Sequence, residues 1–165
     1  MTLAIVGILA ALAAPSMTNF IQYLRVNSEI SGFISDLGYV RAEAVKEGQT
    51  VTMCASSDGK TCSGSNNWQN GWIIFSDPNL TKATTSTTPV LRKQVAWLKT
   101  DTFVADNSAS FVTFTSDGFT RNLPGTSVVT FTLHTNPVNA YASKCVSLNK
   151  AGRHQLQSPG TGNCT

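Results

Sequence analysis

The chain has 165 residues, of which 41% are hydrophobic and 13% charged, and its formal net charge is +3. This length fits one domain with an appendage, and the charged share is about half the usual one. A net charge this small does not by itself imply nucleic-acid binding. Its distribution is uneven, because no acidic residue follows Asp117, whereas four basic residues do: Arg121, Lys144, Lys150 and Arg153. Ordinary solubilising charge is the simpler interpretation of that cationic C-terminal part.

The first stretch, MTLAIVGILAALAA, is uncharged, and the first charged residue of the chain is Arg25. As a helix it would reach about two-thirds of the way across the hydrocarbon core of a bilayer, because a spanning helix needs about 20 apolar residues. It also lacks the basic segment that opens a signal peptide. We therefore expect either a membrane helix whose first residues precede Met1, or a buried core helix.

Small residues in this stretch recur at spacings of three, four and three: Ala4, Gly7, Ala11 and Ala14. Such a stripe lets helices approach closely in a membrane or a fibre core, although it is also compatible with lipid-tolerant filler. Pro15 has no backbone N–H to donate, so we expect a kink or local melting of the helix there.

Hydrophobic residues keep a helical period from Met17 to Val45, and charged residues fall mostly elsewhere. This pattern indicates an amphipathic helix, for which Gly48 supplies a stop. We predict one helix from the first residues to about Glu47. Residues 1–24 form its membrane or fibre half, and residues 25–48 form a spine that packs against a sheet.

From Gln49 the hydrophobic period becomes two, which predicts a β domain over residues 49–165. Val51, Met53 and Ala55 alternate with polar residues as in a half-buried strand. We expect the strands at 51–55, 71–75, 90–98, 102–105, 111–115, 119–121, 128–133, 144–149 and 153–156, with an exposed loop at 80–89. The last two strands form a hairpin that turns near residues 150–152.

The four cysteines form two sequence-near pairs, Cys54 with Cys62 and Cys145 with Cys164. Three connectivities are possible, and we expect the sequence-near one. The spacings differ from those of structural zinc sites. Oxidised cysteines imply the periplasm or the cell exterior, and each bridge would stabilise the fold by about 2–4 kcal/mol.

The segment MTLAIVGILAALAAPS resembles the N-terminal helix of type IV pilins and type II secretion pseudopilins. In that family a Gly-Phe-Thr-Leu-Ile-Glu segment at the prepilin peptidase site runs into such a helix, which has a proline at its end. Aligning that proline on Pro15 places about seven family residues before Met1, close to the deficit in span length. The peptidase glycine, the methylated phenylalanine and the glutamate are therefore not in this chain.

The resemblance extends through the segments DLGYVRAEAVKEGQTVTMC, GWIIFSD, PVLR, GFTR and KCVSLNKAGR to the GspH/FimT class, which includes pseudopilin H and the minor pilins FimU and FimT. In that class an Arg-x-Glu-Ala-(aliphatic)-Lys-x-Gly pattern ends the helix and leads into the β domain. The matching residues here are Arg41, Glu43, Ala44, Val45, Lys46 and Gly48.

This resemblance implies an α+β, type IV pilin-like fold in which a long N-terminal helix packs on an antiparallel β domain. It implies a single-pass inner-membrane protein with its β domain in the periplasm, whose partners are other major and minor pilins or pseudopilins. The leading expectation is a minor pilin needed for assembly or priming of a type IV pilus. The alternatives are a DNA-binding minor pilin for uptake in natural transformation, and a type II secretion pseudopilin H in protein export.

No enzyme motif is present, and we expect no catalytic residue, cofactor, metal site or small-molecule substrate. His134 and His154 stand 20 residues apart, with no carboxylate between or after them. An isolated strand histidine is usually structural. Three tryptophans are expected as core or loop anchors: Trp68, Trp72 and Trp97.

The sharpest candidate site is the tail from Lys150 to Gln155, which resembles the Gly-Arg-x-Arg motif of DNA-binding FimT-like pilins. Gly152 and Arg153 match the motif, but Gln155 replaces its second arginine and cannot neutralise a phosphate. Double-stranded DNA is the candidate ligand of this tail, and three basic residues and a protonated histidine could compensate for the missing charge: Lys144, Lys150, Arg121 and His154. In the alternative interpretation Gly152 makes the hairpin turn and Arg153 is a solvated strand charge.

Overall fold

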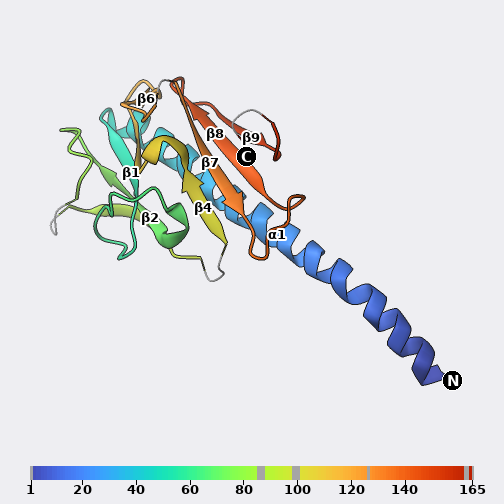
Figure 1. Ribbon diagram of the computed structural model, residues 1–165. Coiled ribbons are helices and arrows are strands. Elements are labelled where there is room, and N and C mark those ends of the chain that lie inside the picture. Colours follow the sequence, from blue (N-terminus) through green and yellow to red (C-terminus); the bar gives the residue numbers. More distant parts are fainter. Residues whose placement is uncertain (1, 85–87, 98–100, 126, 162–163, 165) are drawn as a thin grey trace.

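The computed structural model describes residues 2–165 except 85–87, 98–100, 126, 162–163 and 165, and for residues 2–16 it describes the backbone alone. A long helix, α1 (Thr2–Glu47), packs its C-terminal half on two antiparallel sheets and extends well beyond them toward its N-terminus (Figure 1). The α+β fold expected from the sequence is therefore confirmed. Within the described part of the chain, no helix combines the length and apolarity needed to cross a membrane.

The first sheet has five strands in the order β3-β2-β1-β5-β6, and the second has four in the order β4-β7-β8-β9. Two short 3₁₀ segments, η1 (Trp68–Asn70) and η2 (Asp106–Ser108), connect strands. The strands are β1 (Val51–Ala55), β2 (Gly71–Ser76), β3 (Val90–Val95), β4 (Thr102–Ala105), β5 (Phe111–Phe114), β6 (Thr120–Arg121), β7 (Val128–His134), β8 (Lys144–Asn149) and β9 (His154–Gln157).

The predicted single helix is confirmed, and it ends at Glu47 as expected. Of the two outcomes predicted at Pro15, local melting is wrong, because α1 continues through that residue without interruption, and a kink stays a prediction. Proline removes one intrahelical hydrogen bond, and the turns on either side keep theirs. The structure does not describe the side chains of the small-residue stripe or of Pro15. The role of these residues in helix packing therefore stays a prediction: Ala4, Gly7, Ala11, Ala14 and Pro15.

One face of α1 forms the centre of the core, at helical spacing, through residues that are at most 2% exposed: Val26, Ile30, Phe33, Leu37, Val40 and Ala44. Phe33 lies among aromatic rings from both sheets and from η1, with ring centroids 4.7–5.8 Å away: Trp68, Trp72, Phe103 and Phe131. Truncating a phenylalanine in such a place costs about 3–5 kcal/mol. The helix spine and both sheets therefore share one core.

The strand β1 is buried on both faces, so the half-buried strand expected there is wrong. Its inner face packs on α1, while Cys54 on its outer face lies in a second cluster with Ile73 and Phe75. The polar residue in the middle of the strand is satisfied internally, because the Thr52 hydroxyl bonds Asp77 at 3.0 Å and Thr113 at 2.8 Å. The alternation of apolar and polar residues in β1 therefore reflects hydrogen bonds to buried polar side chains rather than contact with water.

Both predicted disulfides are present, Cys54–Cys62 and Cys145–Cys164, with Cα–Cα distances of 5.6 Å. The first closes the loop over the outer face of β1. Within this loop the Asp58 carboxylate accepts hydrogen bonds from the Thr61 backbone and hydroxyl and from the Lys60 backbone N–H, which lower the pKa of that carboxyl. The second disulfide ties the C-terminal tail back to β8.

Candidate functional site

The predicted turn between the last two strands is present, and Gly152 is required in it. Gly152 has φ +71°, and an added Cβ would lie 2.5 Å from the Gly118 carbonyl oxygen and 3.0 Å from the Phe114 ring. The turn is closed by Asn149, whose backbone N–H donates to the Arg153 carbonyl and whose side-chain oxygen accepts from the Arg153 N–H, both at 3.0 Å. Gly152 therefore serves the turn, and Arg153 leaves it at a fixed position.

This turn is docked on two elements that are distant in the sequence. The Thr120 backbone N–H of β6 donates to the Lys150 carbonyl at 3.0 Å, and the Thr120 hydroxyl donates to the Asn149 carbonyl at 3.2 Å. From α1, Arg41 Nη1 donates to the Gly152 carbonyl at 3.4 Å. The packing therefore gathers four exposed basic residues at one end of the β domain, which we call the cationic cluster: Arg41, Arg121, Lys150 and Arg153.

The cationic cluster keeps a net positive charge. Asp117 lies close enough for Arg121 to help lower the pKa of its carboxyl, although hydrogen bonds from the Thr115 hydroxyl and the Phe119 backbone are the larger causes. Four basic residues and this one carboxylate give a formal charge of +3. Side chains that converge and stay exposed can bind a polyanion such as a nucleic-acid backbone.

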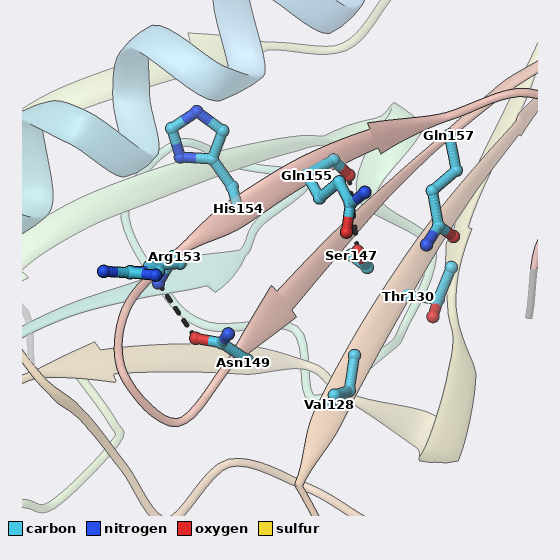
Figure 2. Close-up of a pocket in the computed structure, with 8 residues that line it drawn as sticks. All are labelled: Val128, Thr130, Ser147, Asn149, Arg153, His154, Gln155 and Gln157. Atoms are coloured by element: carbon cyan, nitrogen blue, oxygen red, sulfur yellow. Dashed lines mark hydrogen bonds between the residues drawn. The ribbon is translucent and has the colours of Figure 1, made fainter. Parts of the chain in front are cut away.

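One of the residues predicted for this site, Lys144, lies elsewhere. Lys144 starts β8, six residues before Lys150, which is about 20 Å along an extended strand. Its Nζ donates to Asn27 Oδ1 at 2.5 Å and lies 5.1 Å from the centroid of the Tyr23 ring. His154 follows Arg153 and lines the same groove, with its side chain on the opposite side of β9 from that of Gln155 (Figure 2).

Sequence reasoning missed Arg41. It was noted only as part of the pattern that ends the helix, 111 residues from its hydrogen-bond partner. Its position near the helix C-terminus, together with the excess of basic residues after Asp117, was the available signal. Nothing in the sequence specified that the helix end and the last hairpin would meet.

A groove of about 550 Å³ runs from Arg153 along the outer face of the second sheet (Figure 2). Gln155 lies in it, so an amide occupies the place where the resembling motif would put a second arginine. Two side chains in the described groove wall keep a buried oxygen without a hydrogen-bond partner, Thr130 Oγ1 and Gln157 Oε1. The groove is thus lined mainly by polar, uncharged side chains, with the charge of Arg153 at one end.

Among the described residues, no three His, Cys, Asp or Glu side chains gather in a way that could hold a metal ion. All four cysteines form the two disulfides, so none is a free thiol. The predicted tryptophan anchors lie in or against the core, with Trp68 and Trp72 fully buried and Trp97 packed against it.

Comparisons with known proteins extend these observations. A family model described as "Type II transport protein GspH" matches residues 29–152, from the helix spine to the turn before Arg153. No curated protein gives a significant match. Among solved structures, the type IV minor pilin FimU of Pseudomonas aeruginosa strain PAO1 is similar in two crystal forms. The P21 form has a TM-score of 0.65 and 24% sequence identity, and the match covers 86% of this chain and 97% of FimU. The P65 form has a TM-score of 0.61 and 25% sequence identity, and the match covers 81% of this chain and 97% of FimU.

The match to the family model covers most of the spine of α1, every strand except β9 and most of the last hairpin turn, which is well over half of the chain. The architecture around that span is shared with a solved minor pilin. This chain therefore belongs to the family of the type II transport protein GspH, in the class that includes the FimU minor pilins.

Proposed function

We propose that this chain is a minor pilin or pseudopilin that takes part in assembling a type IV pilus. The single observation that carries the proposal is the family match over residues 29–152. The helix α1, which extends far beyond its own β domain, agrees with it (Figure 1). A helix that merely supported the β domain would end where its contacts with the sheets end. This one continues for about seven turns beyond Val26 toward its N-terminus, where it could reach partners outside the chain.

The described part of that extension supports a role in packing between subunits. Four of its hydrophobic side chains are more than half exposed: Met17, Phe20, Ile21 and Leu24. Each could remove apolar surface from water in contact with a lipid tail or a neighbouring helix, worth about 1.5–3 kcal/mol when fully buried. The uncharged segment before Arg25 would thus sit in the inner membrane before assembly and in the fibre core afterwards, with the β domain in the periplasm.

Assembly is tested by deleting the gene and complementing it with variants. We expect deletion to reduce the number of surface fibres, the wild-type gene to restore them, and Ile21→Asp to fail because a carboxylate cannot be buried against apolar helices. Val95→Asp is the matched control, since Val95 is exposed on β3. Normal piliation after deletion together with loss of protein export would assign the chain to a type II secretion system instead. Normal piliation and normal export would contradict both.

A second candidate function is capture of double-stranded DNA, which the convergence of Arg41 with Arg121, Lys150 and Arg153 favours. If all four contact phosphates, the affinity falls with salt with a log–log slope of about −3.6. We expect Arg153→Ala to weaken binding at low salt and to make the slope shallower by about one, because one phosphate contact is lost. Lys93→Ala, which removes an exposed charge from β3, is the matched control.

The measurement is fluorescence anisotropy of labelled DNA titrated with the full chain at low and near-physiological salt. Absence of binding at both salts, or equal loss in the Arg153 and Lys93 variants, would contradict a DNA site in the cationic cluster. Assembly of the fibre would then remain as the function of the chain.

A further inference from the structure

The connection between β7 and β8, residues 135–143, lies against α1 where the helix leaves the β domain (Figure 1). It carries two side chains that are almost fully exposed, Val138 at 78% and Tyr141 at 94%. A small hollow of about 240 Å³ lies between Tyr141 and Tyr23 of the helix. Apolar and aromatic groups are thus presented to the outside at the base of the domain.

The connection is held rigidly on the helix, so this exposure is not that of a free loop. Gln22 is 5% exposed; its amide nitrogen donates to the Pro137 carbonyl at 3.4 Å, and its oxygen accepts from Asn139 Nδ2 at 3.0 Å. The same Asn139 nitrogen reaches Asn19 Oδ1 at 3.2 Å. Asn139 Oδ1 in turn accepts from the Tyr141 backbone N–H at 3.1 Å. Two helix side chains therefore fix the place of Tyr141.

The distribution of charge around the β7–β8 connection is that expected of a segment at a bilayer surface. No charged residue occurs in the helix before Arg25 or in the connection from Thr135 to Ser143. The first charge after the connection is Lys144, held over the Tyr23 ring at 5.1 Å. Tyrosine is enriched where hydrocarbon meets headgroups, and a lysine beside it favours anionic headgroups.

We infer that the β7–β8 connection, through Val138 and Tyr141, together with Tyr23 and Lys144, docks on the anionic headgroup region of the membrane that holds the helix. The inference rests on the proposed membrane seat of the uncharged helix segment. Asn19 and Gln22, which hold the connection, lie in the last two turns of that segment before Arg25, so the connection reaches the level at which the segment meets the headgroups. The contact would set the height and tilt of the β domain above the bilayer before the subunit joins a fibre.

The test uses the full chain reconstituted in vesicles of phosphatidylcholine and anionic phosphatidylglycerol. Tyr141→Trp places a fluorophore at the proposed contact, and Val95→Trp places one on exposed β3 as a matched control. The wild-type spectrum is subtracted, because the chain already contains tryptophans. We expect the emission of Tyr141→Trp to shift to shorter wavelength and to be quenched by lipids brominated near the headgroup, whereas that of Val95→Trp does neither.

Flotation of the vesicles separates the two possible failures. If the wild-type chain does not float with the vesicles, the proposed membrane seat of the helix is wrong and the inference falls with it. If the chain floats but Tyr141→Trp behaves as it does in solution, the seat stands and the docking is overturned. A third outcome is that the emission of Tyr141→Trp shifts to shorter wavelength as the protein-to-lipid ratio rises but is not quenched by the brominated lipids. The connection would then contact a neighbouring subunit rather than lipid, which also overturns the inference.

Discussion

The two ends of β8 carry the same residue type in opposite situations. At one end Lys144 bonds Asn27 of the helix and lies over Tyr23, so its charge is engaged by the helix. At the other end Lys150 is exposed in a turn beside three arginines, and its own contacts are made by its backbone. Lys144 and Lys150 carry the same charge, but Lys144 makes a structural contact with the helix, whereas the side chain of Lys150 is exposed to solvent.

The two ends of the β domain therefore differ in how their charges are held. The end where the helix emerges is built from uncharged residues and engaged charges, which suits contact with lipid or with helices. The far end gathers free cations, which suits a polyanion. The predictions below test that division, beginning with the largest expected effect.

The first prediction concerns the ion pair near the emerging helix. Arg25 donates to both oxygens of Asp101 at 2.7 and 2.8 Å, and the side chain of Asp101 is 0% exposed. Arg25→Ala leaves that carboxylate buried without its partner, so we expect a loss of about 3 kcal/mol in the free energy of unfolding.

The matched control is Arg153→Ala at the far end, where an exposed arginine should change stability by less than about 0.5 kcal/mol. Chemical denaturation followed by circular dichroism measures both variants. Equal losses in the free energy of unfolding for Arg25→Ala and Arg153→Ala would show that the charges at the two ends contribute equally to stability.

The second prediction concerns Glu29, which lies one helical turn after Arg25. Burial and the nearby charge of Asp101 raise the pKa of Glu29 from 4.5 to about 7, and Arg25 opposes them in part. The folded chain therefore holds this proton more tightly than the unfolded chain. Its contribution to stability is complete below pH 4.5 and declines as the pH rises to about 7.

We expect Glu29→Gln to raise stability above pH 7 by about 1 kcal/mol, a value reduced for the partial exposure of the group. The gain should vanish well below pH 4.5, where the carboxyl is neutral in both the folded and the unfolded state. Melting temperatures across this range measure the effect. A gain that is the same at both ends of the range would show that the ionisation of Glu29 is not its cause.

The third prediction compares the two lysines directly and has the smallest effect on folding. Lys150→Gln and Lys144→Gln each remove one charge, and we expect both to change stability by less than about 1 kcal/mol. Lys150→Gln should weaken DNA binding at low salt and make its salt dependence shallower by about one unit, whereas Lys144→Gln should leave both unchanged. Anisotropy titrations decide this, and equal losses would mean that net charge rather than the cationic cluster binds the DNA.

Much of the fold could be predicted from local patterns. The helix end at Glu47 was indicated by Gly48, and the final hairpin was indicated by two alternating segments around Gly152. The pattern failed at β1, because alternation cannot distinguish water from a second layer of protein that covers the polar side. At Pro15 it could not decide between a kink and local melting, and the helix does not melt there.

The sequence by itself determined the long helix, the alternating strands, the pairing of near cysteines and the family of the chain, because each depends on neighbours within a few residues or on a fixed order of short motifs. Only the tertiary structure decided which charges are free. Lys144 and Lys150 are equivalent in sequence, and Arg41 belongs to a helix far from the last hairpin. Their different roles follow from the docking of that hairpin on α1 and β6, since an electrostatic site depends on distances in space and on exposure to water.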